Sequence, residues 1–152
     1  MAGVISDGFL IAWLLFALLS VVAACGDSVT SWKSEDKENI QHFFASQKAD
    51  LDAAQISNSG APYSIMPDAE RKEFVRLMRV ALFEAKLLRD EVLAKANEEL
   101  PKQFRNLYQQ SLELRLRNLE LGDMTAEIKG SALHDQWVEW FNANRSAIRI
   151  PK

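Results

Sequence analysis

The sequence predicts an all-α protein, in which an N-terminal hydrophobic signal or anchor helix precedes a bundle of about four helices. After the first apolar block, hydrophobic residues recur at intervals of three and four over long stretches, which is the spacing of one helix face. The breaks between these stretches carry helix-ending residues: Gly60, Pro62, Pro101 and Gly122. We therefore divide the chain into an N-terminal segment 1–24, a tether 25–33, a bundle domain 34–147 and a tail 148–152, loose or extended.

The first bundle helix is expected over residues 34–55, with Ser34 as its N-cap and acidic residues in its first turn. His42 lies beside the apolar face and four residues after Glu38, with which it can pair. The apolar face consists of Ile40, Phe43, Phe44, Leu51 and Ala54. Trp32, just before this helix, either packs on the bundle or lies at lipid headgroups, where tryptophan is enriched.

The second helix is expected from Pro67-Asp68 to about Leu100, after a polar loop over 57–66. One of its sides is apolar, and the opposite side carries a basic stripe. That stripe either forms a solvated face or makes an electrostatic contact with phosphates or an acidic partner. Its members are Lys72, Arg76, Arg79 and Lys86.

Pro101 predicts a corner before the third helix, because proline inside a helix removes a hydrogen bond and clashes with the preceding turn. A single kinked rod through Pro101 is the alternative. The third helix is expected to end at Leu121, followed by Gly122. Residues 123–130 are expected to form a turn or one helical turn, and the last helix is expected over 131–146.

The third helix is apolar around an unusually wide arc, with a second leucine stripe formed by Leu107, Leu114 and Leu121. This helix is either central in the bundle or uses the second stripe to contact another protein. Arg115 falls within the arc, so we expect it to be paired with a carboxylate or to extend to the edge of the core.

The last helix carries Trp137, Trp140 and Phe141 on one face. Each of these side chains can bury a large area, so a core position is one interpretation. The other interpretation is an aromatic anchor for a partner, because such residues are enriched in binding hot spots.

The N-terminal segment holds an uncharged apolar block over residues 9–25, which ends in Val22-Ala23-Ala24-Cys25 and is followed by Gly26. These four residues resemble the lipobox of bacterial lipoproteins, in which an aliphatic residue and two small residues precede a cysteine. The resemblance covers about the first 25 residues. It implies cleavage before Cys25 and a diacylglycerol on its thiol, and two or three acyl chains hold a protein lastingly in a membrane. Glycine after the cysteine, in place of aspartate, implies the outer membrane rather than the inner one.

Residues 1–8 contain no lysine or arginine, although a secretory signal begins with a basic region. The alternative is therefore an uncleaved membrane anchor over residues 9–25, which is short for a span unless neighbouring residues extend it. A buried core helix is a third interpretation.

Functionally, the sequence predicts a membrane-tethered, non-enzymatic lipoprotein on the periplasmic side of the bacterial envelope that binds another envelope protein. A single-pass accessory subunit of a membrane complex is the alternative, and an enzyme of unknown type is a third. The net charge of −3 argues against a nucleic-acid binder. With a single cysteine and two histidines at no metal spacing, and no glycine-rich phosphate loop, we expect neither a metal nor a cofactor.

Overall fold

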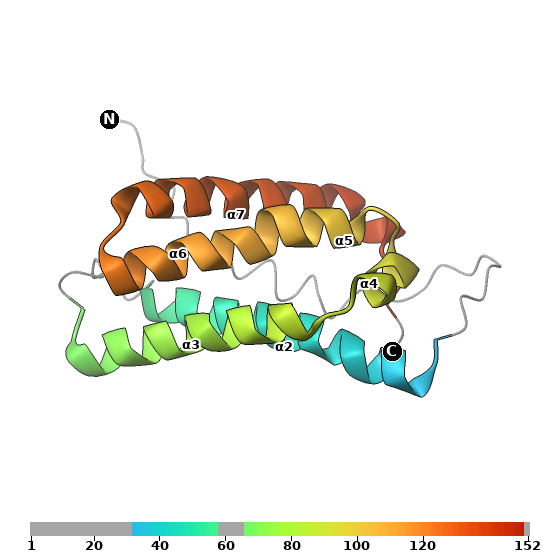
Figure 1. Ribbon diagram of the computed structural model, residues 1–152, viewed down its shortest axis with the longest axis horizontal. Coiled ribbons are helices and arrows are strands. Elements are labelled where there is room, and N and C mark those ends of the chain that lie inside the picture. The colour runs from blue at the N-terminus through green and yellow to red at the C-terminus, as the bar shows by residue number, and fades with distance from the viewer. Residues whose placement is uncertain (1–31, 58–65, 151–152) are drawn as a thin grey trace, which may run out of the picture.

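The structure is a computed structural model that describes residues 32–57 and 66–150, and every regular element in these two ranges is helical (Figure 1). The elements in chain order are α2 (Ser34–Ser57), α3 (Asp68–Leu87), α4 (Asp90–Ala96), α5 (Leu100–Gln103), the π-helix η2 (Phe104–Gln109), α6 (Gln110–Leu121), α7 (Met124–Asn144) and the 3₁₀ turn η3 (Arg145–Ala147). The predicted all-α class is confirmed for this part of the chain.

Two antiparallel helix pairs make up the bundle. α2 packs against α3, and α6 packs against α7 (Figure 1). α5, η2 and α6 follow one another as one continuous rod, so the described residues form four long rods and the short α4. The predicted number of about four is thus close, and α4 is the additional helix.

The start of α2 agrees with the prediction, but its cap does not. The Lys33 carbonyl accepts the first helical hydrogen bond from the Lys37 N–H, which makes Lys33 the N-cap and Ser34 the first helical residue. The Asp36 carboxylate accepts from the Lys33 N–H at 3.2 Å, an arrangement that satisfies one of the free N–H groups at the helix end. The predicted cap at Ser34 is therefore wrong.

The predicted second helix to Leu100 is also wrong, because α3 ends at Leu87 and the shorter α4 follows. No glycine or proline marks this break. Side chains from other helices take over the final carbonyls of α3 instead. The Asn39 amide donates to the Leu87 carbonyl at 2.9 Å, and the Arg105 guanidinium donates to the carbonyls of Ala85 and Leu88.

Pro101 lies in the first turn of α5, where its missing N–H costs no helical hydrogen bond. The chain has reversed its direction through α4 by then, so the predicted corner is confirmed and the kinked rod is wrong. At the other end of this rod, Gly122 has φ 71°, and its N–H reaches the Asn118 carbonyl at 2.7 Å. The predicted helix end at Gly122 is confirmed, since glycine adopts this left-handed cap without strain.

The sequence predicts a turn or one helical turn over residues 123–130, but residues 124–130 form the first third of the longer helix α7. The Asp123 carboxylate caps the helix by accepting from the Ala126 N–H at 3.0 Å. Gly130 is a contact point rather than a break. A Cβ atom there would lie 2.9 Å from Arg115 Cγ and 3.1 Å from the Arg115 backbone nitrogen, so glycine lets α6 and α7 approach closely.

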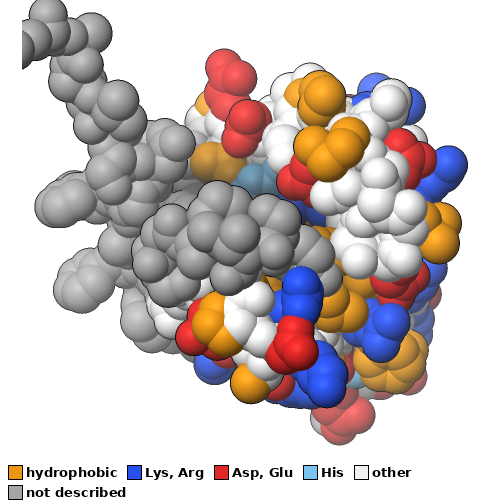
Figure 2. Space-filling view, turned by 90° about the vertical axis from the view of Figure 1, so that its left-hand side faces the viewer, with side chains coloured by type: hydrophobic (Ala, Val, Ile, Leu, Met, Phe, Trp, Pro, Cys, Tyr) orange, Lys and Arg blue, Asp and Glu red, His pale blue; other side chains and the backbone are white. Residues whose placement is uncertain are grey.

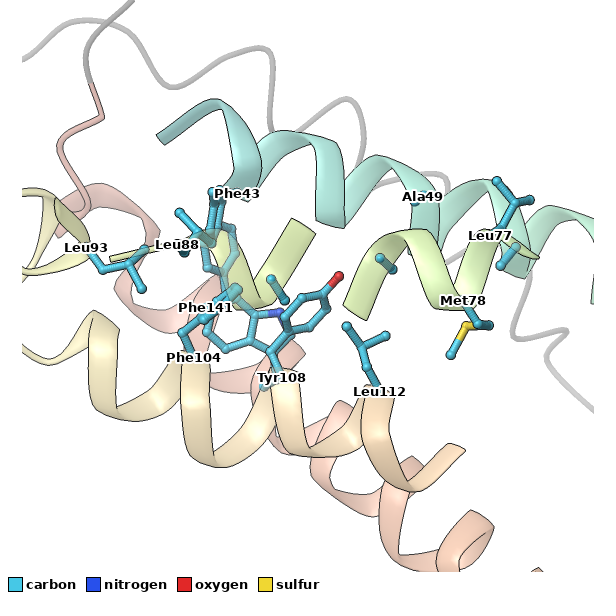
Figure 3. Close-up of a cluster of buried hydrophobic side chains, with 14 of the residues drawn as sticks. Phe43, Ala49, Leu77, Met78, Leu88, Leu93, Phe104, Tyr108, Leu112 and Phe141 are labelled. Carbon is cyan, nitrogen blue, oxygen red and sulfur yellow. The ribbon is translucent and has the colours of Figure 1, made fainter. Parts of the chain in front are cut away.

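An aromatic cluster fills the core between the two helix pairs (Figure 3). Phe43 of α2 lies 5.7 Å from Phe104 and 6.0 Å from Phe141, measured between ring centroids. Tyr108 lies 5.5 Å from Trp137 of α7. Aromatic pairs at these separations contribute beyond the area that they bury. The π-helix η2 positions Phe104 and Tyr108 in this cluster, and both are fully buried.

Both ends of the described chain pack on the bundle. Trp32 contacts the core, in agreement with the packing interpretation of that residue. Ile148 is buried in extended backbone after α7, and the Arg149 N–H donates to the Ala96 carbonyl at 2.9 Å. The predicted signal or anchor 1–24, Cys25 and the tether up to residue 31 lie outside the described residues.

Candidate functional site

A buried ionic cluster joins three helices. Arg115 of α6 contacts the Asp50 carboxylate of α2 at 3.2 Å, and His134 Nε2 of α7 lies 3.3 Å from the other Asp50 oxygen. Burial alone would raise the pKa of Asp50, but the charges and hydrogen bonds of Arg115 and His134 outweigh it and hold that pKa below its ordinary value. Arg115 is therefore paired, as the sequence predicted.

Tyr108 lies beside this cluster with its hydroxyl 3.1 Å from Ser46 Oγ. Ser46 donates to the Ala81 carbonyl at 2.7 Å, so Tyr108 donates to Ser46. Burial and the negative charge of Asp50 raise the pKa of Tyr108 well above its ordinary value. This hydroxyl therefore stays protonated, and it cross-links the two helix pairs.

His42 pairs with a different partner from the one predicted. Its Nδ1 lies 2.6 Å from Glu84 Oε2 of α3, so the contact joins two helices, whereas the predicted Glu38 partner lies on the same helix. Each histidine is thus engaged with one carboxylate from another helix. Within residues 32–57 and 66–150, no group of three or more His, Cys, Asp or Glu side chains is arranged to hold a metal ion.

The basic stripe lies on the exposed side of α3, as its spacing predicts, but most of its cations have glutamate partners. Arg76 is 2.6 Å from Glu73. Arg79 and Lys86 reach across to α6, where they contact Glu120 at 2.8 Å and Glu113 at 3.3 Å. These ion pairs are exposed to solvent, where such pairs contribute little and exchange partners easily. Lys72 is exposed.

The predicted partner-binding residues do not form one surface. Trp137 and Phe141 are buried in the aromatic cluster, and Trp140 is half-buried with its ring stacked on Trp137 at 5.8 Å. Leu107 packs partly against the core, and Leu114 is half-buried as well. Leu121 alone is freely exposed, with 76% of its surface accessible.

Leu121 belongs to an exposed apolar group that the sequence interpretation missed. Met124 and Ile128, at the start of α7, are 64% and 71% exposed. We call Leu121, Met124 and Ile128 the distal patch. Met124 and Ile128 are four residues apart, which is a helical spacing. The sequence interpretation did not use this spacing because it assigned residues 123–130 to a turn or one helical turn. The patch lies at the end of the bundle that faces the viewer in Figure 2.

A cleft of about 580 Å³ opens beside the distal patch, where the ends of the four rods meet. Its apolar lining includes Phe74, Leu119 and Met124. Its polar lining includes Asn118, whose amide donates to the Glu127 carboxylate at 3.2 Å. The cleft thus extends the apolar surface of the distal patch inward, and these polar groups have protein partners.

No family model, curated protein or solved structure matches this chain. Among the described helices, none combines the length and the apolar character that crossing a bilayer requires.

Proposed function

We propose that this chain is a membrane-tethered, non-enzymatic helical lipoprotein that acts as an adaptor in the bacterial envelope. The tether comes from the lipobox-like Val22-Ala23-Ala24-Cys25, through which Cys25 would carry the lipid. The observation that supports a binding role is the distal patch, because three large apolar side chains stand together beside an apolar cleft.

The distal patch lies at the end of the bundle opposite the tether, where a protein partner can reach it. The tether joins the bundle at Ser34, whereas Ser57, at the other end of α2, lines the cleft beside the patch. A helix rises ~1.5 Å per residue, so these two ends are roughly 35 Å apart. A partner could therefore reach the distal patch while Cys25 stays in the membrane, on the periplasmic side.

The partner must use more than the three exposed side chains. Burying one such side chain fully contributes about 1.5–3 kcal/mol, and these three are already partly covered. A micromolar complex needs about 8 kcal/mol of net binding free energy. The proposed partner therefore also fills the cleft, and an apolar side chain entering between Phe74 and Met124 is the contact that we expect.

Photo-cross-linking tests the adaptor role. A photoreactive amino acid at Ile128 should yield one discrete adduct in intact cells, and the same residue at the exposed Gln136 of α7 should yield none. The adduct should disappear when Leu121 and Met124 are both replaced by serine. A chain that stays free of adducts and monomeric in gently solubilised membranes would remove the support for this function.

A single-pass accessory subunit is the second candidate, because residues 1–8 contain no lysine or arginine. In that case the N-terminal segment stays uncleaved and spans the membrane. The variant Cys25→Ser separates the two functions. It should release a lipoprotein from the membrane or block its processing, and it should leave a spanning subunit in place.

A further inference from the structure

A second exposed apolar pair lies on α3, far from the distal patch. Phe83 is 60% exposed and Leu87 is 41% exposed, and residues four apart stand one above the other on a helix. We call these two residues the α3 patch. A single exposed apolar side chain is ordinary on a protein surface, so the meaning of this pair depends on what surrounds it.

The basic stripe lies on the same face of α3 as this pair. At 100° per residue, all four of its cations lie within ~60° of Phe83 around the helix axis. Three of them have exposed glutamate partners, as described above, and Lys72 has no ion pair within the described ranges. Binding to a membrane surface scales with the apolar area that is buried and with the attraction of cations to anionic lipids, and this outer face of α3 offers both.

The α3 patch also lies at the end of the bundle where the tether enters. The Asn39 side-chain nitrogen donates to the Leu87 carbonyl at 2.9 Å, and Asn39 Oδ1 accepts from the Arg89 N–H at 3.0 Å. Asn39 is five residues from Ser34, which is about 8 Å along the helix. Cys25 precedes Ser34 by nine residues, which reach at most roughly 32 Å when fully extended. A lipid on Cys25 would therefore keep the α3 patch close to the membrane.

We propose that the α3 patch rests on the phospholipid surface, with Phe83 and Leu87 at the boundary between headgroups and acyl chains and the basic stripe at the phosphates. This inference rests on the proposed lipid tether. It also gives an orientation, because α3 then lies in the plane of the membrane and the bundle lies on its side. The distal patch points along the membrane toward neighbouring proteins.

Spin labels on the full chain, purified and reconstituted into vesicles of phosphatidylethanolamine and phosphatidylglycerol, test this contact. Lipidation consumes the Cys25 thiol, so in the variants Phe83→Cys and Leu87→Cys the label attaches at one position. The measured quantity is the ratio of collision rates with oxygen, which concentrates in lipid, and with a water-soluble nickel chelate. Ala143→Cys is the matched control, because Ala143 is exposed near the same end of the bundle, on α7. Ile128→Cys reports on the distal patch.

The ratio at residues 83 and 87 should exceed that at 143 and 128 by at least about threefold. Equal ratios at all four positions would overturn the contact. Labels at 83 and 87 that are aqueous in pure lipid but shielded in native membranes would also overturn it, and would assign this face to a protein. Flotation separates the two proposals. A chain that does not float with the vesicles overturns the tether, whereas a floating chain with an aqueous label at 83 overturns only the α3 contact.

Discussion

Replacing Arg115 by methionine should destabilise the bundle strongly, because it removes one partner of a buried ion pair. The Asp50 side chain is only 9% exposed and lies 3.2 Å from Arg115. Removing one partner of such a pair costs about 3–5 kcal/mol, because the other charge stays buried without full compensation. Total stabilities are about 5–15 kcal/mol, so this single change takes away a large share.

The reverse change should cost less. In Asp50→Leu the arginine loses its partner, but Arg115 is 17% exposed and lines the cleft, so its guanidinium can reach water. Changing both residues removes both charges, and such replacements of an ion pair by apolar side chains are often neutral or stabilising. We therefore expect the double variant to be more stable than Arg115→Met alone.

Thermal unfolding of the full chain in a mild non-ionic detergent, followed by far-UV circular dichroism, measures these effects. For a domain of this size, 3–5 kcal/mol corresponds to a fall in Tm of roughly 10–20 °C for Arg115→Met. The double variant should recover at least half of that fall. A fall in Tm below about 3 °C for Arg115→Met, or a double variant whose loss equals the sum of the single losses, would refute this reasoning.

Four further changes test other contacts by the same unfolding measurement. Because the folded pKa of Asp50 is lowered, its contribution to stability is present above the unfolded pKa of about 3.9 and is lost as pH falls through the folded value. Tm should thus fall below about pH 4, and the fall should be shallower in Asp50→Asn; equal slopes would contradict this. Gly130→Ala should lower the free energy of unfolding by about 1–3 kcal/mol despite the better helix propensity of alanine, because the new Cβ would meet the side chain and backbone of Arg115. An increase in Tm would instead show that α6 and α7 can separate freely. Gly122→Ala should cost about 1 kcal/mol through its positive φ alone, since nothing lies within 4 Å of the new Cβ. Tyr108→Phe should lower the free energy of unfolding by about 1 kcal/mol. In the parent chain, ultraviolet absorbance should show one of the two tyrosines still protonated until the protein unfolds at alkaline pH. Two ionisations near pH 10 would contradict the burial of Tyr108.

The sequence predicted those features of the fold that have a local cause. The apolar spacing of α2 and of the rod ending at Leu121 identified both helices, and Gly122 marked a left-handed cap that glycine alone adopts easily. Pro101 identified the start of α5 for a similarly local reason, because proline fits only the first turn of a helix.

The failures have long-range causes. α3 ends at Leu87 because Asn39 and Arg105, which are remote in sequence, satisfy its final carbonyls, and nothing near Leu87 indicates this. Residues 123–130 are predicted to form a turn or one helical turn, but Gly130 lies inside α7, where it leaves room for Arg115 to pass on the way to Asp50. Asp123 was the available clue, since aspartate is a preferred N-cap and would have placed Met124 and Ile128 on a helix.

The candidate site was predictable only in part. The charges of the basic stripe could be assigned to one helix face, but their glutamate partners on α6 depend on how α3 and α6 pack. Leu121 was selected for its stripe, whereas the distal patch around it forms only because α7 begins at Met124. The aromatic residues of α7 fitted two interpretations, a core position and a binding anchor. The packing of Trp137 against Phe43, Phe104 and Phe141 decides for the core.

The mass of the N-terminal peptide of the chain isolated from its native membrane tests the central claim most directly. We predict a peptide that begins at Cys25 and carries a thioether-linked diacylglycerol with an additional amide-linked acyl chain. An intact N-terminus at Met1 with a free Cys25 thiol would contradict the lipoprotein account and favour the uncleaved anchor.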